Sequence, residues 1–284
     1  MPLNKACIGK EYPPTTVEVT AEATQKYARA CNDDNRAFFD AARPGGVVAP
    51  PMFAVVATWN PTMSAVMDPE AGADLLRLVH GEQDMHFLAP IRPGDRITAR
   101  AKITAIETKA TGETMTVELD AVNQDGVAVN HSIFSAFIRG GGRRGAAPEP
   151  RSEEAPAHGE PVVTVSQTID ADQTVRYAEA SGDRNPIHVD KNVARMAGLP
   201  GIIVHGLCTM AFTSKVMIDS LCGGDPMRLK RLRVRFSRPV RPGQTITTRV
   251  WADRERDGRR IYAFETVTAE GQAVIRDGVA EIGA

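Results

Sequence analysis

The stretch IIVHGLCTMAFTSKVMIDSLCGG, residues 202–224, decides the fold of this chain. Apolar side chains would lie on every face of a helix formed by these residues, so we expect a buried core helix that begins near His205 and Gly206. Gly223 and Gly224 should end it, because glycine readily takes the left-handed conformation that closes a helix. A helix without a polar face must be covered by other elements.

The segments around this helix have the pattern of an antiparallel sheet. VVTVSQT (162–168) alternates as a strand, and ADQTVRYAEA (171–180) is a helix candidate. After the core helix, the stretches RLKRLRVRFSRPV, QTITTRVWAD, RRIYAFETVTA and QAVIRDGVAEI alternate or are β-branched, with Pro-Gly and Asp-Gly turns between them. One long helix wrapped by a curved antiparallel sheet is the hot-dog arrangement, an α+β fold.

The chain repeats this design. TAEATQKYARACNDDNRAFFD (20–40) matches DADQTVRYAEASGDRNPIHVD (170–190), with their tyrosines 150 residues apart. FLAPIRPGDRITARAKI (87–103) matches FSRPVRPGQTITTRVWA (236–252) at an offset of 149 residues. Two matches in the same order, at nearly the same offset, indicate a duplicated domain and therefore a double hot dog.

The two copies are joined by a segment with the composition of a linker. RGGGRRGAAPEPRSEEAPAHGEP (139–161) is rich in Gly, Pro, Ala and charged residues and has no apolar periodicity. We expect an amino-terminal hot dog over 1–140, a linker over 141–160 and a carboxy-terminal hot dog over 161–284. The first copy should repeat the order of elements, with two helices and then strands near 21–31, 50–59 and 84–139.

The composition is that of a globular protein without a nucleic-acid or membrane partner. The 284 residues are 42% hydrophobic and 24% charged with a formal net charge of -1, so no charge excess points to nucleic acid. No stretch approaches the ~20 apolar residues of a membrane span, and the start resembles no signal peptide, so we expect a cytoplasmic protein. The four cysteines lack CxxC spacing and Cys/His clustering, which indicates neither a zinc site nor a disulfide framework.

The loop SGDRNPIHVD (181–190) holds the residues that can do chemistry. Pro186 bars a regular helix, so Asp183 and His188 can converge on one point. A carboxylate and an imidazole that share a water could activate it, one removing a proton while the other passes a proton to carbon. That chemistry suits hydration or dehydration. Ser181 is near enough that covalent catalysis stays open at this point.

A second motif, VHG at 204–206, places Gly206 at the expected start of the core helix. There the backbone N–H groups are unpaired and the helix dipole is positive. Because glycine has no side chain, a thioester oxygen could come close, and an N–H donor would stabilise the enolate-like oxygen that develops when water adds. The motif therefore predicts an oxyanion hole.

Together, YAEASGDRNPIHVD, IIVHG and RFSRPVRPG resemble the signature of the MaoC-like, type-2 enoyl-CoA hydratases in their two-domain form. The resemblance implies reversible hydration of trans-2-enoyl-CoA to (3R)-3-hydroxyacyl-CoA, with no cofactor and no metal. The substrate would be a thioester of CoA or of an acyl carrier protein. Asp183 and His188 would activate water. Asn185 would orient them, and the Gly206 N–H would form the oxyanion hole.

The same resemblance implies substrate contacts in both copies. HGEQ (80–83) and the later lysine in ETKATG match positions that contact the CoA thioester from the first domain, which would also hold the acyl tail. The phenylalanine of RFSRPVRPG falls at a pocket-lining position. The expected contact residues are His80, Gly81, Lys109, Arg184, Pro186, Ile187 and Phe236.

We expect the first copy to be catalytically silent. Asp33 and Asn35 repeat the carboxylate and the amide of the loop, but Phe38 replaces the histidine and cannot move protons. Asn32 stands in place of the loop glycine, and a Pro-Pro pair lies near where the helix glycine would be. One active site is therefore predicted, with the other copy kept for binding.

Several of these features have structural alternatives. The Asp-Arg-Asn-Pro run could be only an Asx-type turn, and His188 only a structural histidine. His80 could simply begin a strand, and Lys109 could be a solvated surface residue. The arginines of 228–235 could contact CoA phosphates or form a solvated strand face. The Met and aromatic side chains of 52–67 could line an acyl tunnel or belong to the core.

Two other functions would fit the same fold. A hot-dog thioesterase would take the same CoA substrate and release its thiol, and a non-catalytic acyl-thioester binding protein would bind without turnover. The sequence leaves open the acyl chain, the carrier and the physiological direction. A homodimer would fit if a sheet edge or the helix layer needs covering.

Overall fold

The computed structural model describes residues 2–75, 77–140 and 159–284. Most of the expected linker, residues 141–158, lies outside the described residues, so its boundaries stay a prediction. The first half supplies five strands, β1 (Thr15–Glu18), β2 (Leu78–Phe87), β3 (Arg96–Thr108), β4 (Gly112–Val122) and β5 (Ala128–Arg139). The second half supplies five more, β6 (Val163–Thr168), β7 (Leu229–Phe236), β8 (Thr245–Arg256), β9 (Arg259–Thr268) and β10 (Ala273–Gly283).

Each half has one short and one longer helix. These are α1 (Ala21–Ala30) and α2 (Ala54–Val66) in the first half, and α3 (Gln173–Ser181) and α5 (Gly206–Leu221) in the second. A further short helix, α4 (Lys191–Met196), belongs to the second half. Among the one-turn 3-10 helices, three matter below: η2 (Arg36–Phe38), η3 (Pro51–Phe53) and η4 (Pro186–His188). Within the described parts of the chain, every helix is too short or too polar to cross a bilayer.

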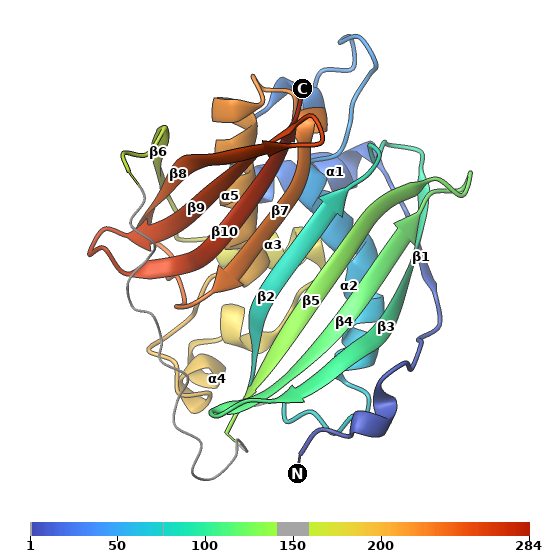
Figure 1. The fold of residues 1–284 in the computed structure, drawn as a ribbon, viewed down its shortest axis with the longest axis vertical. Coiled ribbons are helices and arrows are strands. Elements are labelled where there is room, and N and C mark those ends of the chain that lie inside the picture. The colour runs from blue at the N-terminus through green and yellow to red at the C-terminus, as the bar shows by residue number, and fades with distance from the viewer. Residues whose placement is uncertain (1, 76, 141–158) are drawn as a thin grey trace.

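All ten strands join in one sheet, in the order β1-β3-β4-β5-β2-β7-β10-β9-β8-β6. Followed inward from its own edge, each half has the same strand order, so β2 and β7 meet at the centre and pair antiparallel. The helices lie together against one face of the sheet (Figure 1). The predicted double hot dog, an α+β fold, is confirmed.

The expected elements are largely confirmed, with four differences in detail. The core helix begins at Gly206 as predicted, but the helix expected over 50–59 runs on to Val66. The strands that follow α2 begin at Leu78 rather than near residue 84, and the first half also has β1 (Thr15–Glu18), which the sequence did not predict. The loop after the predicted catalytic residues also contains α4, whose six residues are too few to show helical periodicity in the sequence.

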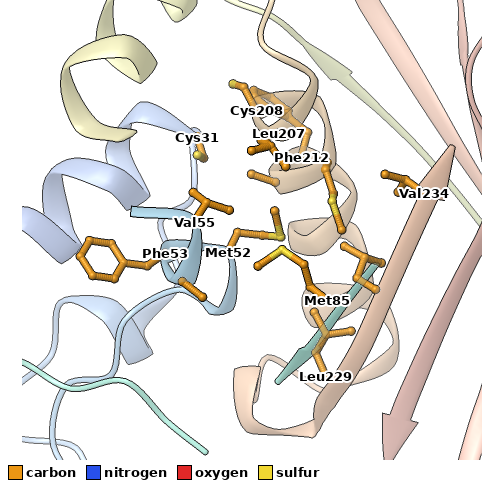
Figure 2. Close-up of a cluster of buried hydrophobic side chains, with 14 of the residues drawn as sticks. Cys31, Met52, Phe53, Val55, Met85, Leu207, Cys208, Phe212, Leu229 and Val234 are labelled. Atoms are coloured by element: carbon orange, nitrogen blue, oxygen red, sulfur yellow. The ribbon is translucent and has the colours of Figure 1, made fainter. Parts of the chain in front are cut away.

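One apolar core spans both halves of the chain. Side chains of η3 and α2 meet those of α5 behind the two central strands, and Figure 2 labels Met52, Phe53, Val55, Leu207, Phe212, Met85 and Val234 among them. Met52 and Phe53 are each 1% exposed and so belong to this core, whereas Met67 is 56% exposed. The first of the two alternatives for this stretch, an acyl tunnel, is therefore wrong for Met52 and Phe53.

Equivalent tyrosines of the sequence repeat contact each other in the structure. Tyr27 and Tyr177, the two tyrosines that are 150 residues apart, place their hydroxyl oxygens 3.2 Å from each other. Both side chains are fully buried, and their ring centroids are 5.6 Å apart. Equivalent residues of the two copies thus touch at the centre of the molecule, as a pseudo-twofold axis requires.

The arginine run on β7 joins the halves across the central strands. Arg231 forms an ion pair of 2.6 Å with Asp84 on β2, and Arg233 lies 3.2 Å from Glu82 on the same strand. Arg235 is 60% exposed and also lies within 4.0 Å of Glu82. These guanidinium groups have carboxylate partners, which favours the strand-face alternative over phosphate contacts.

Candidate active site

The predicted catalytic loop is built from two successive Asx turns. Gly182 takes the left-handed conformation (φ 85°) that ends α3. The Oδ1 atom of Asp183 then accepts the N–H of Asn185 at 3.1 Å, and Oδ1 of Asn185 accepts the N–H of Ile187 at 3.3 Å. The carbonyl of Asn185 accepts the His188 N–H at 3.0 Å. These turn hydrogen bonds fix the backbone of the loop between Asp183 and His188, and the orienting role of Asn185 stays a prediction.

The His188 ring is held in one tautomer. Its Nδ1 lies 2.8 Å from the carbonyl oxygen of Ile203. Because a carbonyl only accepts hydrogen bonds, Nδ1 must carry the proton, and in the neutral ring Nε2 keeps its lone pair. The residue is 7% exposed, so the ring is sheltered from bulk solvent. His188 is thereby prepared to accept a proton at Nε2.

Burial brings the pKa values of Asp183 and His188 closer together. It raises the pKa of the Asp183 carboxyl above its usual range, an effect that the nearby imidazole partly offsets. Burial also lowers the pKa of His188, and the Asp183 carboxylate partly offsets that change. A carboxyl and an imidazole whose pKa values approach each other can share one proton, as acid–base catalysis requires.

A second histidine, His205, completes a cluster with this pair. One oxygen of Asp183 and one ring nitrogen each of His188 and His205 lie within 4.8 Å of one another. However, the two imidazole rings are stacked, with centroids 3.8 Å apart and planes only 27° from parallel. An imidazole binds a metal in its ring plane at about 2.0–2.1 Å, and one ion cannot lie in both planes. The cluster therefore does not suit a metal.

The predicted oxyanion donor lies where the sequence placed it. Gly206 is the first residue of α5, so its N–H has no carbonyl one turn earlier to bind. A Cβ atom at this position would lie 3.3 Å from the ring carbons of Phe236. The phenyl ring thus covers the start of the helix, and a glycine is required there for space.

Two of the expected substrate contacts, His80 and Phe236, are brought together beside Gly206. Their ring centroids are 4.8 Å apart, and the His80 ring also packs against Phe134 at 4.4 Å. Gly81 lies at a bulge in β2, where a Cβ would come within 3.2 Å of a carbonyl oxygen on β5. His80 is therefore inside a strand, as the third residue of β2, and packs against the Phe236 ring that contacts the helix terminus.

The other expected contacts are more widely spread. Lys109 lies on the hairpin between β3 and β4, with its ammonium 2.6 Å from Glu107, and β5 separates this hairpin from β2. On the catalytic loop, Arg184 and Pro186 are exposed and Ile187 is partly buried. Of these four residues, only Lys109 is remote from Asp183 and His188, whereas the other three lie between them on the loop and their contact with substrate stays a prediction.

Covalent catalysis, left open by the sequence, has no suitable nucleophile here. The Ser181 hydroxyl donates to the Tyr177 carbonyl at 2.8 Å and accepts the Asp183 N–H at 3.2 Å. Its side chain is 4% exposed and serves to end α3. Cys208 is fully buried in the core beside α5. Both residues have structural roles.

Sequence reasoning missed two residues of the site. His205 was taken only as the start of the core helix, yet its Nε2 lies 3.0 Å from the Asp183 carbonyl oxygen. Trp59, on α2 of the first half, has Cδ1 3.7 Å from where a Cβ of Gly182 would lie. The adjacency of His205 to Gly206 was the only available signal for the histidine, and Trp59 was considered only as a tunnel or core residue, with no signal for its proximity to the loop.

The first copy repeats the loop without its imidazole. Asp33 accepts the N–H of Asn35 at 3.2 Å, and the Asn35 carbonyl accepts the Phe38 N–H at 3.0 Å. Phe38 is fully buried at the position of the histidine. Asn32 takes the left-handed conformation (φ 53°) in place of the loop glycine, which asparagine tolerates better than most residues.

A lysine of the second copy faces this silent loop. Lys215, on α5, lies 2.7 Å from Asp34, 2.9 Å from Asp219 and 3.7 Å from Asp33. Burial raises the pKa of Asp33 to about 6, and the charge of Lys215 opposes that rise. The carboxylate of the silent loop is thus used in an ion-pair cluster that connects the two halves.

Both halves match dehydratase families, and curated relatives span them. Residues 153–273 match the MaoC like domain, and residues 6–132 match the FAS1-like dehydratase domain region. The probable enoyl-CoA hydratase 2 of Dictyostelium discoideum is 33% identical over 215 residues, or 74% of this chain and 71% of that protein. The 3-hydroxyacyl-thioester dehydratase Y of Mycobacterium tuberculosis is 30% identical over 237 residues, or 78% of this chain and 80% of that protein.

Solved structures agree with these matches. The crystal structure of a MaoC-like dehydratase from Phytophthora capsici has a TM-score of 0.83 and 26% identity, over 99% of this chain and 98% of that one. The similarity thus covers both hot dogs, including the loop of the second one that holds Asp183 and His188. The chain belongs to the family of MaoC-like dehydratases, which are hydro-lyases.

Proposed function

We propose that this protein catalyses the reversible hydration of trans-2-enoyl-CoA to (3R)-3-hydroxyacyl-CoA. The observation that carries the proposal is the meeting of a buried carboxyl, Asp183, and a single-tautomer imidazole, His188, within 4.8 Å of each other. The relatives named above as an enoyl-CoA hydratase and a 3-hydroxyacyl-thioester dehydratase support the same reaction, read in its two directions.

The acid–base pair can perform the addition with one proton between its members. The unprotonated member takes a proton from water while the water oxygen attacks C3, and the protonated member gives its proton to C2. A water O–H bond and the C2=C3 π bond break, and C3–O and C2–H bonds form. The pair again holds one proton at the end, so the scheme needs no oxidant, reductant or cofactor.

The thioester oxygen gains negative charge while water adds. The N–H of Gly206 and the positive end of α5 are the donors for this oxygen. Phe236 and His80 line the approach to that helix terminus, which gives them the role of binding the acyl thioester. Lys109, on its hairpin, would contact the more distant part of the CoA or carrier-protein thioester, and the first copy would take the acyl tail.

The test follows crotonyl-CoA and a longer 2-enoyl-CoA by the ultraviolet absorbance of the conjugated thioester, with a thiol reagent in parallel. We expect the absorbance to fall without thiol release, and the product to be the 3R alcohol by chiral chromatography. Thiol release would indicate a thioesterase instead. Saturable binding with unchanged absorbance would indicate a binding protein, and either outcome refutes the proposal.

A further inference from the structure

We propose that His205 is a positioning residue that fixes Asp183, His188 and Gly206 relative to one another. The inference rests on the proposed hydration and adds a residue that the loop motif and the helix glycine did not assign. His205 is the N-cap residue of α5 and is 1% exposed. It cannot meet the substrate while it stays so deeply buried, so its effect must pass through its neighbours.

The first link runs to the backbone of Asp183. The Nε2–H of His205 donates to the Asp183 carbonyl oxygen at 3.0 Å, while the Asp183 N–H donates to Ser181 at 3.2 Å. The peptide groups on both sides of the catalytic carboxyl are therefore tied to fixed partners. Loss of the imidazole donor would leave the Asp183 carbonyl without this hydrogen bond.

The second link is the stack with His188. The His205 ring lies 3.8 Å from the His188 ring at 27°, and it also packs against Tyr177 with centroids 4.9 Å apart at 48°. Tyr177 is in turn fixed by the hydroxyl contact with Tyr27. The catalytic imidazole thus rests on a column of rings that reaches the junction of the two copies.

The third link is charge. A donor to a carbonyl must carry its proton on Nε2, so Nδ1 of a neutral His205 is unprotonated. Among the described residues nothing lies within hydrogen-bond distance of this buried Nδ1. Burial, together with the charge that His188 can carry, lowers the pKa of His205 to about 3. A ring that stays neutral lets His188 take up a proton without facing a second cation.

Covalent connection supplies the last link. Gly206 directly follows His205, so the side chain that touches the acid–base pair and the N–H that serves as oxyanion donor belong to adjacent residues. A shift of the His205 ring would move the donor relative to both proton carriers. Residues that hold catalytic groups in this indirect way typically change activity by about 10- to 100-fold when replaced.

The experiment compares His205→Phe, His205→Gln and, as a matched control at a partly exposed histidine on β5, His131→Phe. Phenylalanine keeps a flat ring on His188 and loses the donor to Asp183. We expect kcat to fall about 10- to 100-fold with KM within about twofold. In glutamine the side-chain amide can reach the position of Nε2, so part of the lost kcat should return. The control should keep wild-type kcat and KM.

Thermal unfolding of each variant shows whether it is folded. If His205→Phe is not folded, the kinetic comparison is made with His205→Gln. Unchanged kcat in folded His205→Phe overturns the proposal. So does a rise in KM at constant kcat, which would mean direct contact with substrate.

A second measurement needs no turnover. Nitrogen-15 NMR of the histidine rings in the free wild-type enzyme should show His205 neutral with its proton on Nε2 from about pH 5 to pH 8. A charged ring, or a proton on Nδ1, overturns the inference. If wild type fails to hydrate enoyl thioesters while this NMR result holds, the proposed function is wrong and the structural linkage is still established.

Discussion

Replacement of Asp183 by asparagine should remove a proton carrier and leave the catalytic loop folded. The new side-chain oxygen can still accept the Asn185 N–H, which the carboxylate accepts at 3.1 Å. The backbone bonds of residue 183 to Ser181 and His205 do not involve the side chain that is changed. The substitution therefore separates proton transfer from loop geometry.

The size of the effect follows from the role of the carboxyl. A positioned acid or base contributes roughly 10²- to 10⁴-fold to rate, and solvent cannot easily replace it at a site where the partner His188 is only 7% exposed. We expect kcat to fall by at least about 10²-fold, or about 2.7 kcal/mol, with KM nearly unchanged. Because burial raises the pKa of Asp183, a neutral amide should leave the unfolding free energy equal or higher.

The assay is the initial rate of absorbance loss with crotonyl-CoA, together with urea unfolding. The first copy provides a matched control, since Asp33→Asn makes the same change at the same point of the silent loop. Retention of more than a tenth of wild-type kcat by Asp183→Asn would contradict the reasoning. An equal loss in Asp33→Asn would contradict it as well, because the effect would then be structural.

Three further predictions concern single sites. Gly206→Ala should lower kcat toward the roughly 10²-fold effect of losing an oxyanion donor, because the new methyl would lie 3.3 Å from Phe236. Adding Phe236→Leu to this variant should recover part of the lost kcat. No recovery would argue against crowding as the cause. Burial raises the pKa of Asp33 to about 6, above its usual 3.8, so this group adds stability as pH falls from about 7 to about 4. Urea unfolding should show that Asp33→Asn lacks this gain in unfolding free energy. If wild type and Asp33→Asn change in unfolding free energy equally with pH, the raised pKa of Asp33 is refuted. Burial lowers the pKa of His80 from 6.5 to about 4, so its contribution to stability is lost as pH falls through that window. Between pH 7 and pH 5, the unfolding free energy of His80→Phe should therefore fall less than that of wild type.

The parts of the fold that the sequence could predict are those encoded locally. Asx turns and a left-handed glycine or asparagine act within a few residues, so the loop of 181–190 and its silent counterpart share the same Asx-turn hydrogen bonds. The start of α5 is likewise fixed by its own apolar run and glycine. The register of 150 residues then predicted that the copies are equivalent, and the contact of Tyr27 with Tyr177 agrees with it.

Contacts between the copies could not be read from the sequence. The proximity of Trp59 to Gly182, and of Lys215 to Asp33, depends on how two helices and two loops pack across the shared core. No periodicity or motif reports such a distance. The role of His205 was hidden for a related reason, because a histidine before a helix glycine can be a cap, a core residue or a support, and only its neighbours distinguish these.

The silent copy contributes to the active site through these same contacts. Asp33 has no imidazole partner, and burying its carboxylate is unfavourable unless a cation compensates. Lys215 supplies that cation from α5, the helix whose first N–H is the proposed oxyanion donor. Trp59 reaches across in the opposite direction, from α2 to the glycine that begins the catalytic loop. Each copy therefore holds an element of the other in place, and the second half separated from the first would lose a partner of α5, a support of its loop and a large part of the common core.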